Sequence, residues 1–148
     1  MKQSLLFISI ALAIASCTAT RQQGNGHPGA EATGNSSPLQ HKRWILAGFP
    51  GQAFEQPEKD VYILFERDKP QAVGFAGCNG FRGSYETEDR ALHIKNVIST
   101  KMWCNYGPLE QQFIQVLEAT DGYRIWGDSM QFLRGEEVLA SLYGVVVQ

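Results

Sequence analysis

The sequence predicts a mainly β (α+β) domain: a curled, antiparallel, barrel-like sheet of about eight short strands closed by one amphipathic helix. From residue 41 onward, strand-like segments follow one another at hairpin spacing, with Gly, Pro and Asp in the intervals. Only residues 107–121 show helical periodicity. Because strands and helices do not alternate, a doubly wound parallel sheet is disfavoured.

The N-terminus reads as a processing signal. Lys2 precedes an apolar run at 5–15, which is shorter than the about 20 residues that span a bilayer. Ile14-Ala15-Ser16-Cys17 resembles the bacterial lipobox, so we expect 1–16 to be a lipoprotein signal peptide and Cys17 to be lipidated. A plain signal peptide with an incidental cysteine is the alternative.

Residues 17–40 are predicted to form a lipidated, flexible tether. They are rich in Gly, Asn, Ser and Thr, with Leu39 as the one large apolar side chain, so they bury too little surface to fold. Thr18, rather than Asp, follows Cys17. The expected location is therefore the bacterial cell envelope, at the outer membrane facing the periplasm, with the lipid on Cys17 as the membrane contact.

Composition limits the remaining choices. The 148 residues carry a net charge of −2 without long charged blocks, which is unlike the basic footprint of a nucleic-acid binder. Hydrophobic residues make up 43%, enough for one packed domain, assigned to 41–148. No cofactor is expected.

The elements follow in order. Period-two alternation and turn residues predict strands at 43–49, 61–66, 72–76, 82–86, 91–95, 123–126, 129–133 and 138–143, with 97–103 also extended. Pro108 suits the first helical position, and a stripe formed by Leu109, Phe113, Val116 and Leu117 predicts the helix. Gly122 is expected to end it as a left-handed cap.

Two of the three cysteines are predicted to form a structural disulfide. Once Cys17 is lipidated, Cys78 and Cys104 remain as a pair in an oxidising compartment, which favours a disulfide. A redox or nucleophilic thiol is the alternative, although the sequence has no Cys-x-x-Cys motif. A zinc site with His93 is disfavoured because the ligands lack paired spacing.

The glycine-rich stretch 74–85 has its own interpretation. Its glycines run from strand to strand, so bulges and tight bends are favoured over a phosphate loop. Asn79 is expected to cap a turn with its side chain. The acidic residues at 86–89 read as a solvated hairpin tip rather than a metal site, because calcium needs six or more oxygens.

Two motifs stand out in the predicted domain: Gly-Cys-Asn-Gly-Phe-Arg-Gly-Ser-Tyr at 77–85, and Ser-Thr-Lys-Met at 99–102 followed by Cys104. Together they resemble the signature and the second element of the META domain, the HslJ-like family. The resemblance covers about 42–143. Trp103 departs from the small residue usual before that cysteine, and Gly80 from a larger polar one.

The resemblance implies a barrel-like sheet closed by a helix, with no catalytic residues to carry over, so we expect no enzyme. Together with the lipobox and the tether, it implies a membrane-tethered envelope protein in stress or antibiotic tolerance, acting through an envelope partner or by supporting the envelope. A binder of small hydrophobic ligands at a barrel mouth is the alternative. The possible surface contact comprises Phe81, Arg82, Lys101 and Trp103.

Overall fold

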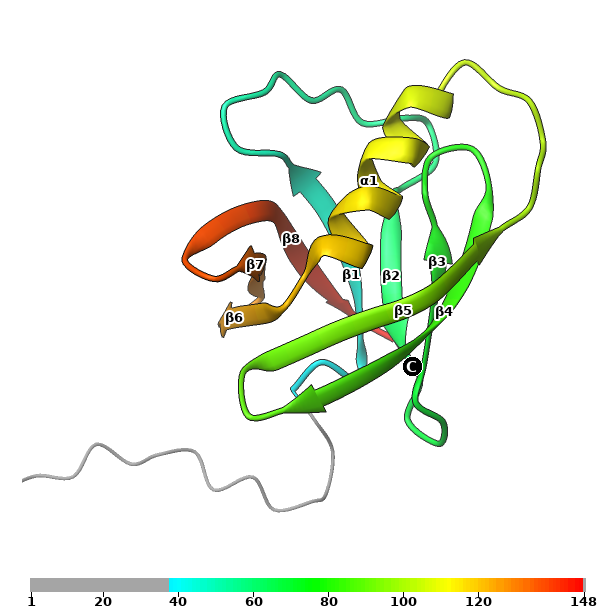
Figure 1. Ribbon diagram of the computed structural model, residues 1–148. Coiled ribbons are helices and arrows are strands. Elements are labelled where there is room, and N and C mark those ends of the chain that lie inside the picture. The colour runs from blue at the N-terminus through cyan, green and yellow to red at the C-terminus, as the bar shows by residue number, and fades with distance from the viewer. Residues whose placement is uncertain (1–37, 148) are drawn as a thin grey trace, which may run out of the picture. The chain divides into compact units, whose positions relative to one another are not determined.

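The computed structural model describes residues 38–147, which form a closed ring of eight antiparallel strands and one helix. The elements run in the order β1 (Lys42–Gly48), β2 (Tyr62–Phe65), β3 (Gln71–Phe75), β4 (Gly80–Glu88), β5 (Ala91–Ser99), α1 (Gly107–Ala119), β6 (Gly122–Trp126), β7 (Ser129–Arg134) and β8 (Glu137–Val146). Each strand pairs with its neighbour in sequence, and β1 pairs with β8 (Figure 1). The predicted mainly β architecture is confirmed.

Alternation places one side of each strand inside the ring. Trp44 and Leu46 of β1 point inward and are buried, as are Ile63 and Phe65 of β2. With Phe113, these side chains belong to one continuous core. Burying an aliphatic or aromatic side chain is worth roughly 1.5–3 kcal/mol, so the interior is the main source of stability.

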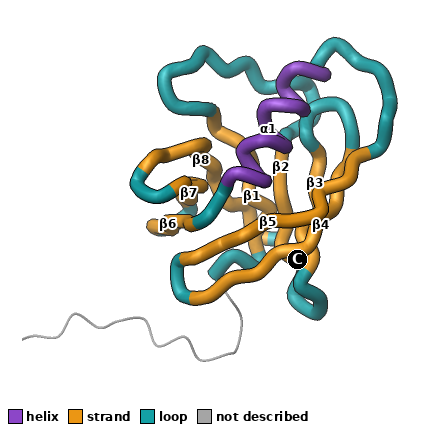
Figure 2. The backbone as a smooth tube through the Cα atoms, viewed as in Figure 1, coloured by secondary structure: helices purple, strands orange, loops and turns teal. Residues whose placement is uncertain are grey.

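The ring is weakest between β5 and β6. Among the described residues, Ala91 and Gly122 are the one Cα pair that joins β5 to β6, whereas β4 and β5 pair along most of their length. Helix α1 packs against β5 and β7 and so covers this seam (Figures 1 and 2). Its buried residues, Phe113 and Leu117, belong to the predicted stripe.

The helix end differs from the prediction. Gly122 does not have a left-handed φ and lies in β6. Instead, Thr120 turns extended (φ −69°, ψ 126°) directly after Ala119, and its hydroxyl donates to the Val116 carbonyl. The Asp121 N–H then donates to Leu133 O of β7, so the chain passes from helix to sheet without a capping glycine.

The start of the domain and the end of β5 also differ from the prediction. Leu39, placed in the tether by the prediction, is fully buried and its carbonyl accepts from the Trp44 indole. The Gln40 amide donates to the Tyr85 hydroxyl, so the domain begins before residue 41. At the other boundary, the extended segment predicted over 97–103 ends with β5 at Ser99, and residues 100–106 form a loop (Figure 2).

Candidate functional site

The site begins at the turn between β3 and β4. Gly77 has φ +102°, a conformation that side chains disfavour, and the Ala76 N–H donates to Asn79 O at 2.9 Å. This tight bend leaves Cys78 and Asn79 buried, 7% and 4% exposed. The predicted role of a glycine as a tight bend is therefore confirmed at Gly77.

A disulfide joins this turn to the 100–106 loop. Cys78 and Cys104 are bonded, as predicted, and lie 26 residues apart in the sequence. Closing a loop of that length is worth about 3.5 kcal/mol in the chain-entropy model. Beside it, the Tyr106 N–H donates to Cys104 Sγ, so the disulfide also fixes the last turn before α1.

Asn79 ties the same loop down by its side chain. Its Oδ1 accepts from the Thr100 hydroxyl (2.8 Å) and the Met102 N–H (2.9 Å). Its Nδ2 donates to Met102 O (3.1 Å) and to Glu110 Oε2 (2.8 Å). The amide thus uses both donors and both acceptor lone pairs, as a buried polar group requires.

This arrangement corrects the prediction for Asn79, which does not cap its own turn. The side chain reaches residues 21 to 31 positions away instead. We call the Cys78–Cys104 disulfide and the Asn79 side chain the clasp. Sequence reasoning missed Thr100 and Glu110, its partners. The available signal was that Glu110 lies in the first turn of α1, where a carboxylate can reach the preceding loop.

The clasp holds an exposed apolar segment. Trp103 is 91% exposed and Met102 68%, while Tyr106 is 41% exposed. Lys101 is exposed beside them. Two of the predicted contact residues, Lys101 and Trp103, are therefore at the surface of one loop, which extends past the N-terminal end of α1 (Figure 2).

The other two predicted contact residues, Phe81 and Arg82, lie on opposite faces of β4. Phe81 is 5% exposed, so the prediction of a surface role is wrong. Its ring packs edge-on against Phe113 of α1, with centroids 6.1 Å apart. It points inward because it shares a side of β4 with Tyr85, whereas Arg82 faces outward and is exposed. Alternation along β4 assigns the two residues to opposite faces.

Two hollows flank the loop. One, of about 550 Å³, lies between the loop and α1 and is lined by Asn79, Trp103, Pro108, Gln111 and Ile114 among others. The second, of about 540 Å³, is lined by Val73, Arg82, Ile98 and Thr100 with neighbouring residues. The 100–106 loop therefore borders the first hollow over most of its length and the second hollow at Thr100.

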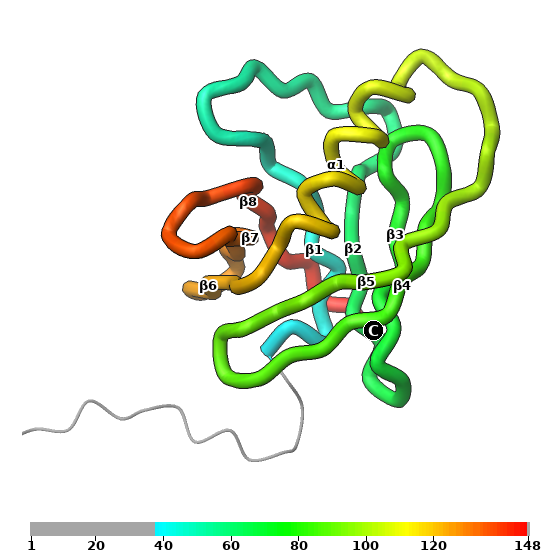
Figure 3. The backbone as a smooth tube through the Cα atoms, in the orientation of Figure 1, coloured from blue at the N-terminus to red at the C-terminus, as the bar shows by residue number. Residues whose placement is uncertain are grey.

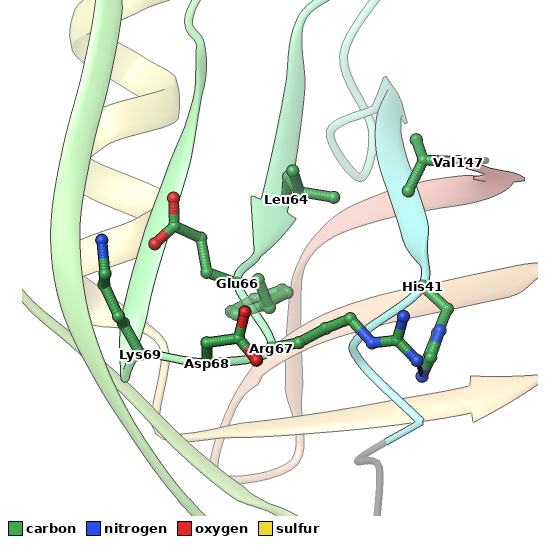
Figure 4. A pocket seen from close by; sticks show the side chains of 8 residues that line it. His41, Leu64, Glu66, Arg67, Asp68, Lys69 and Val147 are labelled. Atoms are coloured by element: carbon green, nitrogen blue, oxygen red, sulfur yellow. Dashed lines mark hydrogen bonds between the residues drawn. The ribbon is translucent and has the colours of Figure 1, made fainter.

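A third hollow, of about 390 Å³, lies next to the first turn of the domain. Figure 4 shows His41 and Arg67 facing each other there, and the Arg67 guanidinium donates to His41 Nε2 at 2.9 Å. Leu64 and Val147 supply its apolar wall. Positive and negative side chains mix around it, so its lining does not select one charge of ligand.

The acidic hairpin is a solvated tip, as its sequence suggests. Glu86 is exposed, and the Lys95 ammonium at 2.7 Å lowers the pKa of its carboxyl. Among residues 38–147, no three His, Cys, Asp or Glu side chains gather as metal ligands would. His93 pairs with Glu86 across β4 and β5, away from the clasp.

The interior bears on the small-ligand alternative. Trp44, Phe65, Phe113 and Phe132 are each at most 1% exposed and fill the ring. Phe113 comes from α1, so the helix itself occupies part of the interior. The interior of the ring is therefore filled by side chains.

Comparison with known families identifies the domain. The family model of the META domain matches residues 37–142. The chain belongs to the META domain family. The match includes Cys78, Asn79 and Cys104, so both halves of the clasp lie within the META domain. No curated protein matches this chain.

Two solved structures share the fold. An NMR structure of a protein from Burkholderia xenovorans superposes with a TM-score of 0.61 at 23% identity, covering 81% of this chain and 97% of its own. A second NMR structure gives a TM-score of 0.56 at 20% identity, covering 71% and 91%. At these identities the likeness concerns the META fold alone.

Cys17 and the predicted signal peptide lie outside the described residues. Within residues 38–147 no helix has the length and apolarity that crossing a membrane would require. The lipid anchor therefore stays a prediction from sequence.

Proposed function

We propose that this META protein is a non-enzymatic, membrane-tethered lipoprotein of the bacterial cell envelope. It acts in stress or antibiotic tolerance by binding a partner protein through the 100–106 loop. The observation that carries the proposal is the clasp, which holds the chain on both sides of a 91% exposed tryptophan, at the Met102 backbone and at Cys104.

Rigid presentation favours binding. Tryptophan is enriched among the residues that dominate interface energies, and its burial against a partner would remove a large apolar surface from water. A loop already ordered by the disulfide and Asn79 loses little conformational entropy on binding. Lys101 would add a charge at the rim, where it affects association rate and partner choice.

The lipid anchor is the second part of the proposal. It rests on the Ile-Ala-Ser-Cys sequence ending at Cys17. The full-length Cys17→Ser variant should leave the membrane fraction and lose acyl-chain mass from the N-terminal peptide. A wild-type protein whose N-terminal peptide carries no acyl mass would contradict the anchor while leaving the loop proposal open to its own test.

The loop is tested by cross-linking in living cells. A photo-reactive residue replaces Trp103 in the full-length protein, and His93, exposed on β5, serves as the matched position. We expect one discrete protein adduct at 103 and none at 93. The adduct should weaken when Asn79→Ala is added, because the loop loses its anchor.

A survival assay provides an independent readout. Trp103→Ser should fail to restore envelope-stress tolerance to a deletion strain, whereas Trp126→Ser should restore it. Trp126 is also exposed, at 49%, but lies on β6. Full complementation by Trp103→Ser at equal protein levels would overturn the assignment of the loop.

A further inference from the structure

Four neighbouring strands carry apolar side chains on their outer face as well as their inner one. The registers place Tyr143, Ile45, Tyr62 and Phe75 in one outward row across β8, β1, β2 and β3. A second outward row contains Val145, Arg43, Leu64 and Val73, and continues to Arg82 and Ile98 on β4 and β5. We call the β8–β1–β2–β3 part the outer apolar face.

This face departs from what a solvated antiparallel sheet needs. One face of such a sheet packs on the core and the other is ordinarily polar. Here Trp44 and Leu46 point inward while Ile45, between them, points outward and is still only 3% exposed. Its strand neighbours Tyr62 and Tyr143 are partly exposed. The exposed part of the face is formed by Tyr143 and Val145, 43% and 41% exposed, and exposed apolar patches mark contact sites.

Cations accompany the aromatic rings. The Arg43 guanidinium lies over the Tyr62 ring at 5.1 Å, and Lys59 Nζ lies over the Phe75 ring at 4.6 Å. Arg43 also pairs with Asp60 at 3.7 Å, while Arg82 has no ion-pair partner among residues 38–147. Tyrosine rings beside basic side chains are suited to the boundary between lipid headgroups and acyl chains.

The chain enters the domain beside this face. His41 precedes β1, its carbonyl accepts from the Val147 N–H, and it shares a hollow with Leu64 (Figures 3 and 4). Residue 38 lies next to the β4–β5 turn, in a hollow with Asp89 and Arg90. The 100–106 loop follows the other end of β5, a strand of nine residues or about 30 Å.

We infer that the outer apolar face rests on the lipid bilayer to which the chain is tethered. The inference rests on the proposed lipid anchor, because a tether of some twenty residues keeps the domain near the membrane. Tethering makes the second contact intramolecular, so a weak affinity for lipid suffices. The side of the ring then lies on the bilayer, and the loop at the far end stays open to a partner.

The domain from 34 to 148 suits a direct test because the described core, the ring and the disulfide lie within residues 38–147. Co-sedimentation uses vesicles of phosphatidylethanolamine and phosphatidylglycerol, without a lipid anchor on the protein. We expect the wild-type domain to bind. Val145→Asp and Tyr143→Asp, both at exposed positions, should each weaken binding about tenfold. His93→Asp, which adds the same charge on β5, should bind as wild type.

Four outcomes would overturn the inference: no binding of the wild-type domain, equal loss in His93→Asp, a dimer that Tyr143→Asp dissociates, or a protein adduct from a cross-linker at 145 without vesicle binding. Thermal unfolding of each variant excludes misfolding as the cause. Because the soluble domain has no anchor, its failure to bind vesicles is distinguishable from failure of the anchor, which the Cys17→Ser variant reports separately.

Discussion

Helix α1 is held in two unlike ways. Along its buried side, Phe113 and Leu117 enter the core and cover the seam between β5 and β6. At its N-terminal end, Glu110 accepts from Asn79, and the disulfide ends two residues before Tyr106. The contact along the buried side is apolar and is part of the core of the whole ring. The contact at the N-terminal end is a hydrogen bond and a nearby disulfide, and it involves only the 100–106 loop.

This difference indicates that the seam and the clasp stabilise different parts of the domain. Apolar packing at the seam should determine whether the ring stays closed, because one residue pair alone joins β5 to β6 in the described ladder. The clasp should determine where residues 100–106 lie. Damage to the seam is therefore expected to unfold the domain, and damage to the clasp to release the loop from a ring that stays folded.

The largest expected effect is at the seam. Phe113→Ala removes a fully buried ring that packs against Phe81, and such truncations cost about 3–5 kcal/mol. Urea denaturation of the 34–148 domain measures the free energy of unfolding. Ile114→Ala, at the adjacent half-buried position, should cost less. Equal losses of unfolding free energy in the two variants would contradict a special role for the buried Phe113 ring at the seam.

Next comes the covalent part of the clasp. Cys78→Ala with Cys104→Ala should lower the free energy of unfolding by about 3.5 kcal/mol, since the unfolded chain regains loop freedom. Amide hydrogen exchange should rise in residues 100–106 while β1 and β8 stay protected. Uniform loss of protection across all strands would contradict a locally acting clasp.

The polar part of the clasp should matter somewhat less. Asn79→Ala leaves the Thr100 hydroxyl, the Met102 peptide groups and the Glu110 carboxylate without their partner, at a cost of about 1–3 kcal/mol. Asn79→Asp keeps the shape but sets a carboxylate 2.8 Å from Glu110 Oε2. Adding Glu110→Gln should recover stability in the Asp variant, and absence of recovery would refute the assigned contact.

The smallest effect is expected away from both regions. The Lys95 hydrogen bond and charge lower the pKa of Glu86, so the contribution of this pair is present above the usual glutamate pKa and lost as pH falls through the folded value. Lys95→Met should return the Glu86 midpoint to its ordinary range in an NMR titration. The melting temperature at pH 7 should hardly change, because both side chains are exposed.

Much of the ring could be predicted from local pattern. Alternation of apolar residues predicted the strands, and the apolar stripe that includes Phe113 predicted the helix. The two cysteines left after lipidation predicted the disulfide. These features depend on residues close in sequence or on chemistry with one available partner. The inward direction of Phe81 is readable from alternation with Tyr85, although Phe81 is included in the surface contact predicted from the sequence.

The clasp could not be derived in this way. The Asn79 partners are 21 or more residues away, and a local turn offered its amide an equally plausible use. Leu39 escaped prediction because its burial depends on a core assembled from distant strands. The outer apolar face required the cross-strand registers, which no single strand shows.

The pairing of β1 with β8 has a consequence for how this domain can be reused. Lys42 lies opposite Val146, so the entry and exit of the ring are neighbours (Figure 3). A module with adjacent ends can be inserted into a surface loop of another protein without stretching either partner, or circularly permuted through a short linker. The domain can therefore be inserted between segments of another protein, and the 100–106 loop would remain accessible at the opposite end of the ring.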